Sequence, residues 1–561
     1  MYLRTVRHLR PQQLVSLVAR RLRSLPDPRV GPATVNPSNA QCMKAALRQL
    51  LRSSNTDRAD EVVSDRFRFL NHVESHPIVD WRRRYVSHLW NYNLHYFDFA
   101  IDLSLAYIAT GDTRYLHTLE KLVSGWIEST KNRRGDAWEP YPIAVRSLNW
   151  MYAYLLVGDA LWPPARDSLL GSILDQLSHL ERNIEWHLMG NHLLKDLKAF
   201  FVGGLLFDGK AGQRWGRIAR EHLWPQIAEQ FLNDGGHFER TPMYHALTFN
   251  DLLEVIYLAR AVGQEVPPMV IERARNASVA TGKFFFRDDC LHLFGDSAQH
   301  VAPSLNHLSA LSELVLENAV AVPSGAWSLP ESGYYGCRRS GSTVIIDCGD
   351  VGASYQPGHG HADTLSYELA INDRPVIVDS GVHGYEGDPY REYVRSTRAH
   401  NTITIDRKDQ SEMWATFRVA RRARLLYAAQ SDETPTYMFE GAYQPYHDSA
   451  ASHHRRVSSE PGRFTVMDVV KGAAGKEIES FIHLHPQLSV KGRDTEFTIA
   501  GHQASIRVTT FGADETSILA STSTPVQGYY CPEFGKALPQ TGLVLRKRRN
   551  DGREFGYQIE W

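Results

Sequence analysis

The sequence predicts an α+β multidomain protein in which a helical domain precedes an antiparallel β-sandwich domain. Three observations lead to this fold class. The chain has 561 residues, which is too long for one ordinary hydrophobic core. Apolar residues recur at helical spacing from about residue 40 to 320. Short runs rich in β-branched and aromatic residues then continue to the C-terminus.

Amphipathic segments follow one another at fairly even spacing through the first half. One of them, FDFAIDLSLAYIATGD, ends on Gly111, and Pro or Gly pairs end several others. The further segments are expected near residues 114–129, 144–161, 166–182, 186–206, 217–232, 244–262, 267–283 and 305–318. Because no strand pattern lies between them, we expect paired antiparallel helices that curl into an α/α toroid.

The second half has a different pattern. Runs such as STVIIDCGD, SYELAIN, PVIVDSG, RFTVMDVV and FGYQIEW are short and bounded by Gly, Asp, Asn or Pro, which is typical of an antiparallel sandwich. INDRP (371–375) predicts a hairpin turn. We therefore divide the chain into a basic N-terminal segment (1–39), a helical domain (40–324) and a β-sandwich domain (325–561).

Composition excludes some classes of function. The formal net charge is −1, so nothing indicates a nucleic-acid partner, although local positive charge could still bind a polyanion. The five cysteines are scattered and include no C-x-x-C pair, which argues against a disulfide framework and a thiolate zinc site.

The N-terminal segment carries six arginines before its first acidic residue, Asp27. A solvated basic helix explains this, and so does a helix that makes peripheral contact with an anionic membrane or a partner. Its apolar stretches are interrupted by Gln13, Ser16 and Arg20, so no secretory signal is evident. We expect a cytoplasmic location, with the periplasm as the alternative.

Histidines are dense between residues 357 and 406. In GHGHAD, His359 and His361 share a face if the segment is a strand, and diverge if the glycines bend it. Asp379 ends a predicted strand and His400 begins another. Two imidazoles and a carboxylate from separated strand ends are a zinc-type set, although hydrogen-bonded polar residues at strand ends explain the pattern equally well.

Three stretches are unusual for ordinary helices: NYNLHYFDF (91–99), MGNHLLKDLKAF (189–200) and GGHFERTPMYHALTFND (235–251). The second and third place polar side chains at expected helix N-termini, which suit anionic ligands. Each alone is weak evidence, because Asn is a common cap and Tyr–His pairs are common in cores.

Together with WEPYPIAVRSLNW and PGHGHADTLSYEL…PVIVDSG…RSTRAHNTITID, these stretches resemble the heparinase II/III and alginate lyase superfamily of polysaccharide lyases. The resemblance covers roughly residues 90 to 406. It implies an incomplete α/α toroid followed by an antiparallel β domain, with the site between them. It also implies β-elimination on a uronic acid within an acidic polysaccharide.

The resemblance assigns roles to individual residues. It implies catalysis by Asn191, His192, Tyr244 and His359, and a structural zinc bound by His361, Asp379 and His400. His383 matches no role in the family and is interpreted as a loop residue. The candidate substrate-binding residues are Arg146, Glu239, Arg240, His95 and Tyr96.

These residue types suit the chemistry. Asn191 and a protonated His192 could hydrogen-bond the uronate carboxylate and so acidify C5, while Tyr244 and His359 could each be base or acid. Arg146 and Arg240 could pair with substrate carboxylates or simply form surface ion pairs. The alternatives are a polysaccharide-binding or assembly protein, a uronate C5-epimerase, and a zinc hydrolase using His361, Asp379 and His400.

Overall fold

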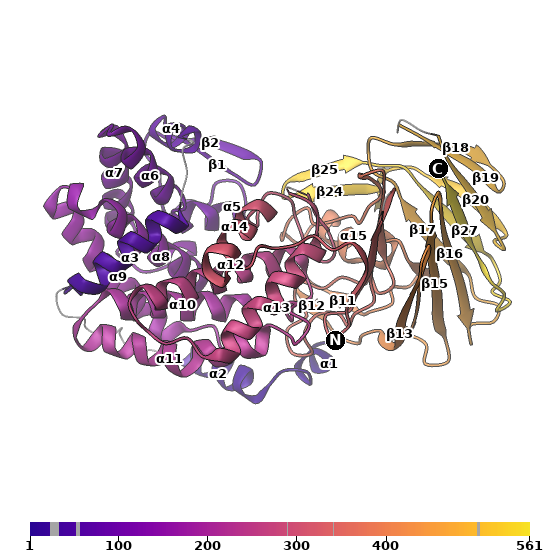
Figure 1. Cartoon of the computed structure of the whole chain (residues 1–561), viewed down its shortest axis with the longest axis horizontal. Helices are drawn as coiled ribbons and strands as arrows, with labels where there is room; N and C mark the ends of the chain where they lie inside the picture. The colour runs from indigo at the N-terminus through magenta and orange to yellow at the C-terminus, as the bar shows by residue number, and fades with distance from the viewer. Residues whose placement is uncertain (23–32, 52–55, 289, 340, 502–504) are drawn as a thin grey trace.

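The computed structural model describes residues 1–22, 33–51, 56–288, 290–339, 341–501 and 505–561. It has a helical half followed by a half built from antiparallel sheets, so the predicted fold class is confirmed (Figure 1). The helices of the described residues are α1 (Tyr2–Val6), α2 (Pro11–Leu22), α3 (Pro37–Leu50), α4 (Asp57–Val63), α5 (His88–Tyr96), α6 (Phe99–Thr110), α7 (Arg114–Ser129), α8 (Pro140–Val157), α9 (Pro163–Asn183), α10 (Gly190–Leu206), α11 (Gly209–Gln230), α12 (Pro242–Ala261), α13 (Pro268–Phe284), α14 (Leu305–Leu316) and α15 (Pro389–Arg395).

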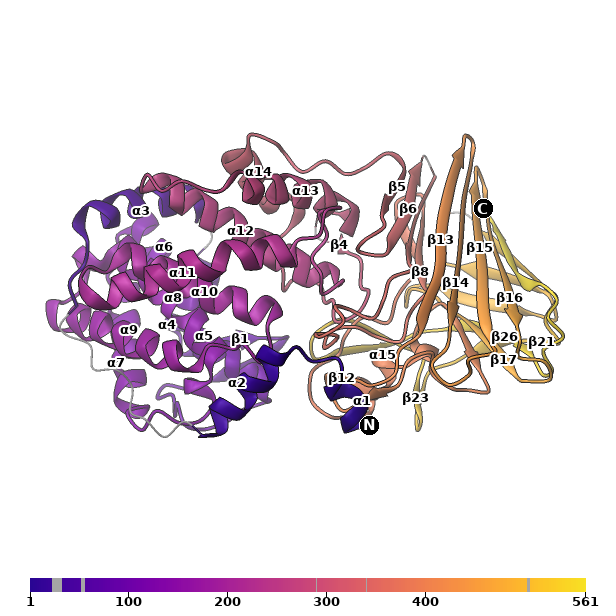
Figure 2. The same ribbon diagram turned by 90° about the horizontal axis from the view of Figure 1, so that it is seen from below.

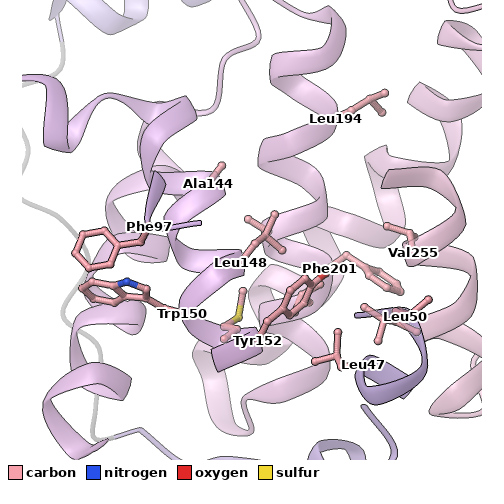
Figure 3. Close-up of a cluster of buried hydrophobic side chains, with 14 of the residues drawn as sticks. Leu47, Leu50, Phe97, Ala144, Leu148, Trp150, Tyr152, Leu194, Phe201 and Val255 are labelled. Atoms are coloured by element: carbon pink, nitrogen blue, oxygen red, sulfur yellow. The ribbon is translucent and has the colours of Figure 1, made fainter. Parts of the chain in front are cut away.

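The helical half is organised around α8, α10 and α12. Side chains from these helices and from α3 point toward one another in one apolar core (Figure 3). Trp150, Phe201 and Val255 belong to this core and are at most 4% exposed. Complete burial of each large apolar side chain contributes about 1.5–3 kcal/mol relative to exposure. This packing gives the helix N-termini that face the β half a rigid support.

Two local expectations needed revision. The stretch NYNLHYFDF is unusual for an ordinary helix, but most of it forms α5, which Ser87 caps by accepting from the backbone N–H of Trp90. The helix expected from 217 begins at Gly209 and contains Pro225 in its interior. Hydrophobic periodicity located both regions, whereas the helix ends depended on local capping.

Antiparallel sheets make up the second half. A five-stranded sheet has the order β5 (Gly325–Leu329), β6 (Tyr334–Arg339), β7 (Ser342–Asp347), β8 (Tyr367–Ile371) and β9 (Arg374–Ile377). A four-stranded sheet has the order β10 (Ile403–Ile405), β17 (Ile478–His483), β26 (Gly542–Lys547) and β21 (Glu515–Leu519). An eight-stranded sheet has the order β13 (Arg424–Glu433), β14 (Thr436–Gln444), β15 (Ser452–Glu460), β16 (Arg463–Lys471), β27 (Phe555–Glu560), β20 (Ile506–Phe511), β19 (Glu496–Ala500) and β18 (Ser489–Arg493).

Two-stranded ribbons complete the described β structure. They are β1 (Arg66–Phe69) with β2 (His72–Ser75), β3 (Phe285–Arg287) with β4 (Cys290–Leu291), β11 (Met413–Trp414) with β12 (Arg418–Val419), β22 (Thr522–Ser523) with β23 (Val526–Gln527), and β24 (Tyr529–Glu533) with β25 (Lys536–Pro539). The β11–β12 ribbon lies beside α1 at the N-terminus (Figure 2).

Alternation of buried and exposed residues along β16 shows that one face of the eight-stranded sheet packs inward. The predicted turn at INDRP joins β8 to β9, with Ile371 paired to Arg374 and positive φ angles at Asn372 and Asp373. These φ angles are those that a two-residue hairpin requires. The prediction of this hairpin is confirmed.

The segment GHGHAD is a loop before β8 rather than a strand, so the interpretation in which its glycines bend the chain is the correct one. All five cysteines are free thiols. Among the described residues, no helix has both the length and the apolar character needed to cross a membrane.

Candidate active site

A cavity of about 460 Å³ lies between the helical half and the β half. Side chains from both halves line it, including four predicted catalytic residues that come from α10, α12 and the loop before β8. The polar and aromatic residues of its wall include Tyr92, Tyr96, Tyr141, Asn191, His192, Tyr244, His359, Tyr385, Arg418 and Arg422.

Asn191 lies at the start of α10, where Glu239 orients it. Its backbone N–H donates to Oε1 of Glu239 at 2.8 Å, and its Nδ2 lies 3.1 and 3.0 Å from the two carboxylate oxygens. Gly190 has a φ of +59°, and a Cβ there would lie 2.0 Å from Oε1 of Glu239. The glycine therefore lets the carboxylate approach the helix end closely enough to fix the amide.

His192, the next residue, faces the cavity with 28% of its side chain exposed. Its Nδ1 lies 2.8 Å from Oε2 of Glu185, and its ring lies against Tyr141 with centroids 4.4 Å apart. Burial alone would lower the pKa of His192, but the charge and hydrogen bond of Glu185 outweigh burial and raise it. The imidazolium form is thereby favoured beside the cavity.

Tyr244 belongs to the first turn of α12 and stacks on His359, with ring centroids 3.9 Å apart and planes at 24°. Its hydroxyl lies 2.8 Å from the hydroxyl of Tyr385. Burial, followed by the proximity of Tyr385 and Asp296, raises the pKa of Tyr244 well above its ordinary value. The phenol therefore keeps its proton at neutral pH and can donate it.

His359 is oriented by Asp296, a buried residue of the loop after β4. Nδ1 of His359 lies 2.9 Å from Oδ2 of Asp296, and Nη2 of Arg391 donates to the same oxygen at 2.9 Å. Burial alone would raise the pKa of Asp296, but Arg391 and the two histidines on it hold the pKa well below its usual range. An ionised carboxylate can only accept, so in the neutral form of the ring Asp296 favours the tautomer with its proton on Nδ1, which leaves Nε2 as the acceptor.

The second histidine on Asp296 is His361, which turns away from the cavity. Its Nε2 lies 2.9 Å from Oδ1 of Asp296, and its side chain is fully buried. His359 therefore lines the cavity and His361 belongs to a separate buried group, while the roles implied for the two rings remain predictions. Asp296 thus joins the two histidines through its two oxygens.

His361, Asp363 and His400 form a buried group whose ligand atoms lie within 4.8 Å of one another, which is compatible with a metal ion. Nδ1 of His361 and Nε2 of His400 have no hydrogen-bond partner among the described residues, although both are buried. The opposite ring nitrogens contact Asp296 and Asp379, at 2.9 and 2.8 Å. Carboxylates commonly hold metal-binding histidines in this way, so the residues fit a metal site.

The carboxylate of this group differs from the prediction. Asp379 was expected as a ligand, but it lies on Nδ1 of His400, on the far side of the ring from the free nitrogen, and Asp363 takes its place. The group does not line the cavity and is at most 6% exposed. A hydrolytic zinc site with an open position for substrate has no access to the cavity in this arrangement.

The predicted substrate-binding residues separate into two sets. Tyr96 lines the cavity, whereas the other four lie outside it. Arg146 is fully buried, donates to Gln176 and to backbone carbonyls, and lies over the ring of Trp126 at 3.9 Å. It is therefore a core residue of the helical half, and a pairing with substrate carboxylates needs an exposure that it does not have.

His95, Glu239 and Arg240 also have partners within the protein. Nδ1 of His95 accepts from the indole N–H of Trp126 at 3.2 Å, and burial lowers the pKa of His95 to about 3. Arg240 donates to backbone carbonyls of the β half, and Glu239 contacts Asn191. These residues support the cavity wall, and their direct contact with substrate remains a prediction.

Sequence reasoning missed Asp296, Tyr385 and Arg391. Asp296 lies 63 positions from His359 in the stretch FGDS, where no spacing connects it to the histidines. Arg391 lies within a short helix, α15, and Tyr385 follows His383 in a loop. Only the folded chain places them beside the predicted residues.

Comparisons with known proteins agree with this architecture. The family profile described as "Heparinase II/III N-terminus" matches residues 32–315, and "Heparinase II/III-like, C-terminal" matches residues 321–558. The heparin-sulfate lyase of Pedobacter heparinus is 26% identical over 343 residues, which cover 55% of this chain and 50% of that protein. The heparin-sulfate lyase of Bacteroides thetaiotaomicron is 22% identical over 399 residues, covering 62% and 55%. The chain spans about half the length of these relatives.

Solved structures show the same fold. A crystal structure of heparinase III superposes with a TM-score of 0.72 at 18% identity, covering 98% of this chain and 88% of that one. Streptomyces coelicolor chondroitin AC lyase in complex with chondroitin sulphate gives a TM-score of 0.54 at 10% identity, covering 98% and 82%. Because both halves match profiles of one family, in the same order, the chain belongs to the heparinase II/III-like family of polysaccharide lyases.

Proposed function

We propose that this chain is a polysaccharide lyase that cleaves a uronic-acid-containing acidic polysaccharide by β-elimination. The observation that carries the proposal is the convergence of an amide, two imidazoles and a phenol on one cavity between the two halves. Family membership supports it, since the curated relatives are heparin-sulfate lyases. The substrate is assigned only to the class of acidic polysaccharides.

Asn191 and His192 are proposed to bind the carboxylate of the reacting uronate. A carboxylate that is hydrogen-bonded by an amide and an imidazolium holds the negative charge that develops when C5 loses its proton. Glu239 orients the amide, and Glu185 favours the protonated form of His192. Both carboxylates therefore act through the residues that they position.

The proton transfers are assigned to His359 and Tyr244. Nε2 of His359, whose Nδ1–H is directed to Asp296, is the proposed base that takes the C5 proton. Tyr244, protonated at neutral pH, is the proposed acid that gives its proton to the departing O4. The C5–H and C4–O4 bonds break, a C4=C5 double bond forms, and no water is consumed.

Zn²⁺ is the ion that we propose for the group formed by His361, Asp363 and His400. Two neutral imidazoles and a carboxylate are donors that zinc prefers. When bound, the ion would supply a structural link between the loop of His400 and the loop before β8. None of the proton transfers above passes through this group.

The test is incubation of the purified protein with a panel of defined acidic oligosaccharides, read by the absorbance of an unsaturated uronate and by mass. A lyase produces new unsaturation and fragments whose masses sum to that of the substrate. Exchange of the C5 hydrogen for deuterium without unsaturation would indicate an epimerase instead. Saturable binding with neither signal across the panel would contradict the proposal and favour a binding protein.

A further inference from the structure

Residues 1–19 form part of the cavity wall, although both family profiles leave them out. We name this segment the N-terminal strap. Thr5, His8, Leu9 and Gln13 of the strap line the cavity that also holds the catalytic candidates. The strap is therefore a feature of this chain that the family match does not explain.

The first part of the strap is attached to the β half. The ring of Tyr2 meets the ring of Trp414 edge-on, with centroids 4.8 Å apart, and the indole N–H of Trp414 donates to Oγ1 of Thr5 at 3.0 Å. Arg4 forms an ion pair with Glu412 at 2.9 Å. These contacts hold α1 against the β11–β12 ribbon.

The second part is attached to the helical half and to the loop before His359. Gln13 is 1% exposed, and its Nε2 donates to the backbone carbonyls of His187 and Tyr355 at 3.2 and 3.3 Å. The guanidinium of Arg10 lies 3.7 Å from the ring centroid of Tyr355 and forms an ion pair with Glu229. A buried glutamine that makes two hydrogen bonds and an arginine stacked on an aromatic ring are typical of a specific, well-packed contact.

The strap consequently crosses from one half of the molecule to the other. Figure 2 shows α1 beside β12, α2 beneath the helical half, and the connection between them spanning the two. A polysaccharide that is cut in its interior must leave the cleft at both ends. A segment fixed to both walls, with side chains in the cavity, obstructs one of these exits.

The strap-lined end of the cavity is also basic. Arg418 and Arg422 line it together with His8. Nε of Arg422 is buried and has no hydrogen-bond partner among the described residues, so the guanidinium has donors left for a ligand. Two of the strap's own arginines, Arg4 and Arg10, are used in ion pairs within the chain, and the membrane contact expected from the basic segment remains a prediction.

We propose that the N-terminal strap closes one end of the cleft, and that Arg422 and His8 receive the acidic group of a terminal sugar there. The protein would then act at chain ends or on short oligosaccharides rather than within long polymers. This inference depends on the proposed lyase function for its reaction, but the closed end of the cleft can be tested by binding alone.

The first experiment compares the wild-type chain with the variant Arg10→Ala/Gln13→Ala on a long acidic polysaccharide built from the sugars of an oligosaccharide that the panel shows to be cleaved. Wild-type protein should release small unsaturated products from the start, while the length of the remaining polymer changes little. The variant should produce at least a few-fold more long fragments for the same absorbance. The control Gln12→Ala, on the exposed side of α2, should behave as wild type. Early long fragments from the wild-type protein would overturn the inference.

The second experiment needs no turnover. Defined acidic oligosaccharides of increasing length are titrated into the full-length protein and followed by tryptophan fluorescence. Affinity should reach a plateau after a few sugars, because a closed end limits the number that bind. Affinity that keeps rising with length would overturn the inference, even where no glycan is cleaved and the proposed reaction has failed.

A third measurement tests the basic end. Arg422→Gln should weaken binding of oligosaccharides with an acidic terminal sugar by about 10- to 100-fold, because a hydrogen bond to a charged group is lost. Binding of the same oligosaccharides with a neutral terminal sugar should not change. Arg424→Gln, an exposed arginine that contacts Gln444, is the matched control. Equal affinity of Arg422→Gln and wild type for both ligands would contradict the role of Arg422.

Discussion

Two buried aspartates of this protein hold an arginine and a histidine in the same way, in two different regions. Asp468, within the eight-stranded sheet, accepts from Arg455 at 2.7 and 2.8 Å and lies 2.8 Å from His453. Asp296, beside the cavity, has Arg391 and His359 in the corresponding roles. In both trios burial alone would raise the pKa of the aspartate, but its arginine partner holds the pKa below its usual value.

The two trios differ in the ring nitrogen that the aspartate leaves free. Nδ1 of His453 is buried and has no hydrogen-bond partner in the part of the chain that the structure describes, whereas His359 lies in the cavity wall beside Tyr244. Asp296 also has a second histidine, His361, which leads to the buried metal-type group. The comparison teaches that an aspartate, an arginine and a histidine can form a structural group in one region and a candidate catalytic group in another. The roles differ because only the histidine beside the cavity is accessible to a substrate.

Substitution of each aspartate by asparagine should separate these roles. Asp296→Asn and Asp468→Asn should each lower the free energy of unfolding by about 3–5 kcal/mol, because each leaves a buried guanidinium without its carboxylate. Only Asp296→Asn should also reduce kcat per folded molecule, by about 10²- to 10⁴-fold, since His359 loses its orienting partner. Denaturant unfolding and kinetics on the folded fraction measure both effects. An equal loss of kcat in the two variants would remove the distinction between the trios.

Substitution of Tyr244, whose ring stacks on His359, tests whether the trio beside the cavity takes part in catalysis. Tyr244→Phe should lower kcat by about 10²- to 10⁴-fold through loss of the proton donor, with little change in stability. Tyr257→Phe is the matched control, because Tyr257 is on the same helix and its hydroxyl donates to Gln49. Retention of wild-type kcat by Tyr244→Phe would exclude it as acid or base.

Metal binding should also distinguish the two trios, because only the Asp296 trio adjoins the group that could bind an ion. After chelation, return of Zn²⁺ should raise the thermal midpoint, by an amount corresponding to about 2.7 kcal/mol at an ion concentration of 100 Kd. His400→Ala should abolish this response, whereas His453→Ala should keep it, because only the Asp296 trio is joined to the His361 group. The measurement is a thermal melt, so it needs no activity. A response that survives His400→Ala would place the ion elsewhere.

The smallest expected effect concerns another carboxylate–histidine pair, Glu185 with His192. The raised pKa of His192 means that its proton is bound more tightly in the folded state. Its contribution to stability is therefore present below the ordinary pKa of histidine and is lost as pH rises through the folded value. Glu185→Gln should leave burial as the main influence and lower the pKa of His192.

The kinetic consequence can be measured as a shift along the pH axis. In Glu185→Gln, the fall of kcat/KM with rising pH should begin at a lower pH than in the wild-type chain, because the imidazolium that binds the uronate carboxylate is lost earlier. Glu221→Gln, an exposed position on α11, should leave the profile unchanged. A superimposable profile for Glu185→Gln would show that the charge of His192 is not used.

Part of the site was predictable because it is local in the sequence. GHGHAD places two histidines within three residues, and α10 and α12 begin at the Gly and Pro that precede Asn191 and Tyr244. The role expected of Arg146 conflicts with its burial, because an arginine in an amphipathic segment gives no sign of whether its donors meet a ligand or backbone carbonyls. The carboxylate of the metal-type group also differed, because the place of Asp379 at a predicted strand end does not show which ring nitrogen of His400 it meets.

The sequence by itself determined the fold class, the INDRP hairpin and most helices, because hydrophobic periodicity and turn residues act over a few neighbouring positions. Only the tertiary structure decided which polar side chains contact one another across long distances in the sequence. Asp296 lies 63 residues from His359 and 95 from Arg391, and Thr5 lies 409 residues from Trp414. Such contacts depend on the packing of whole domains against each other, and no local pattern of residues records them.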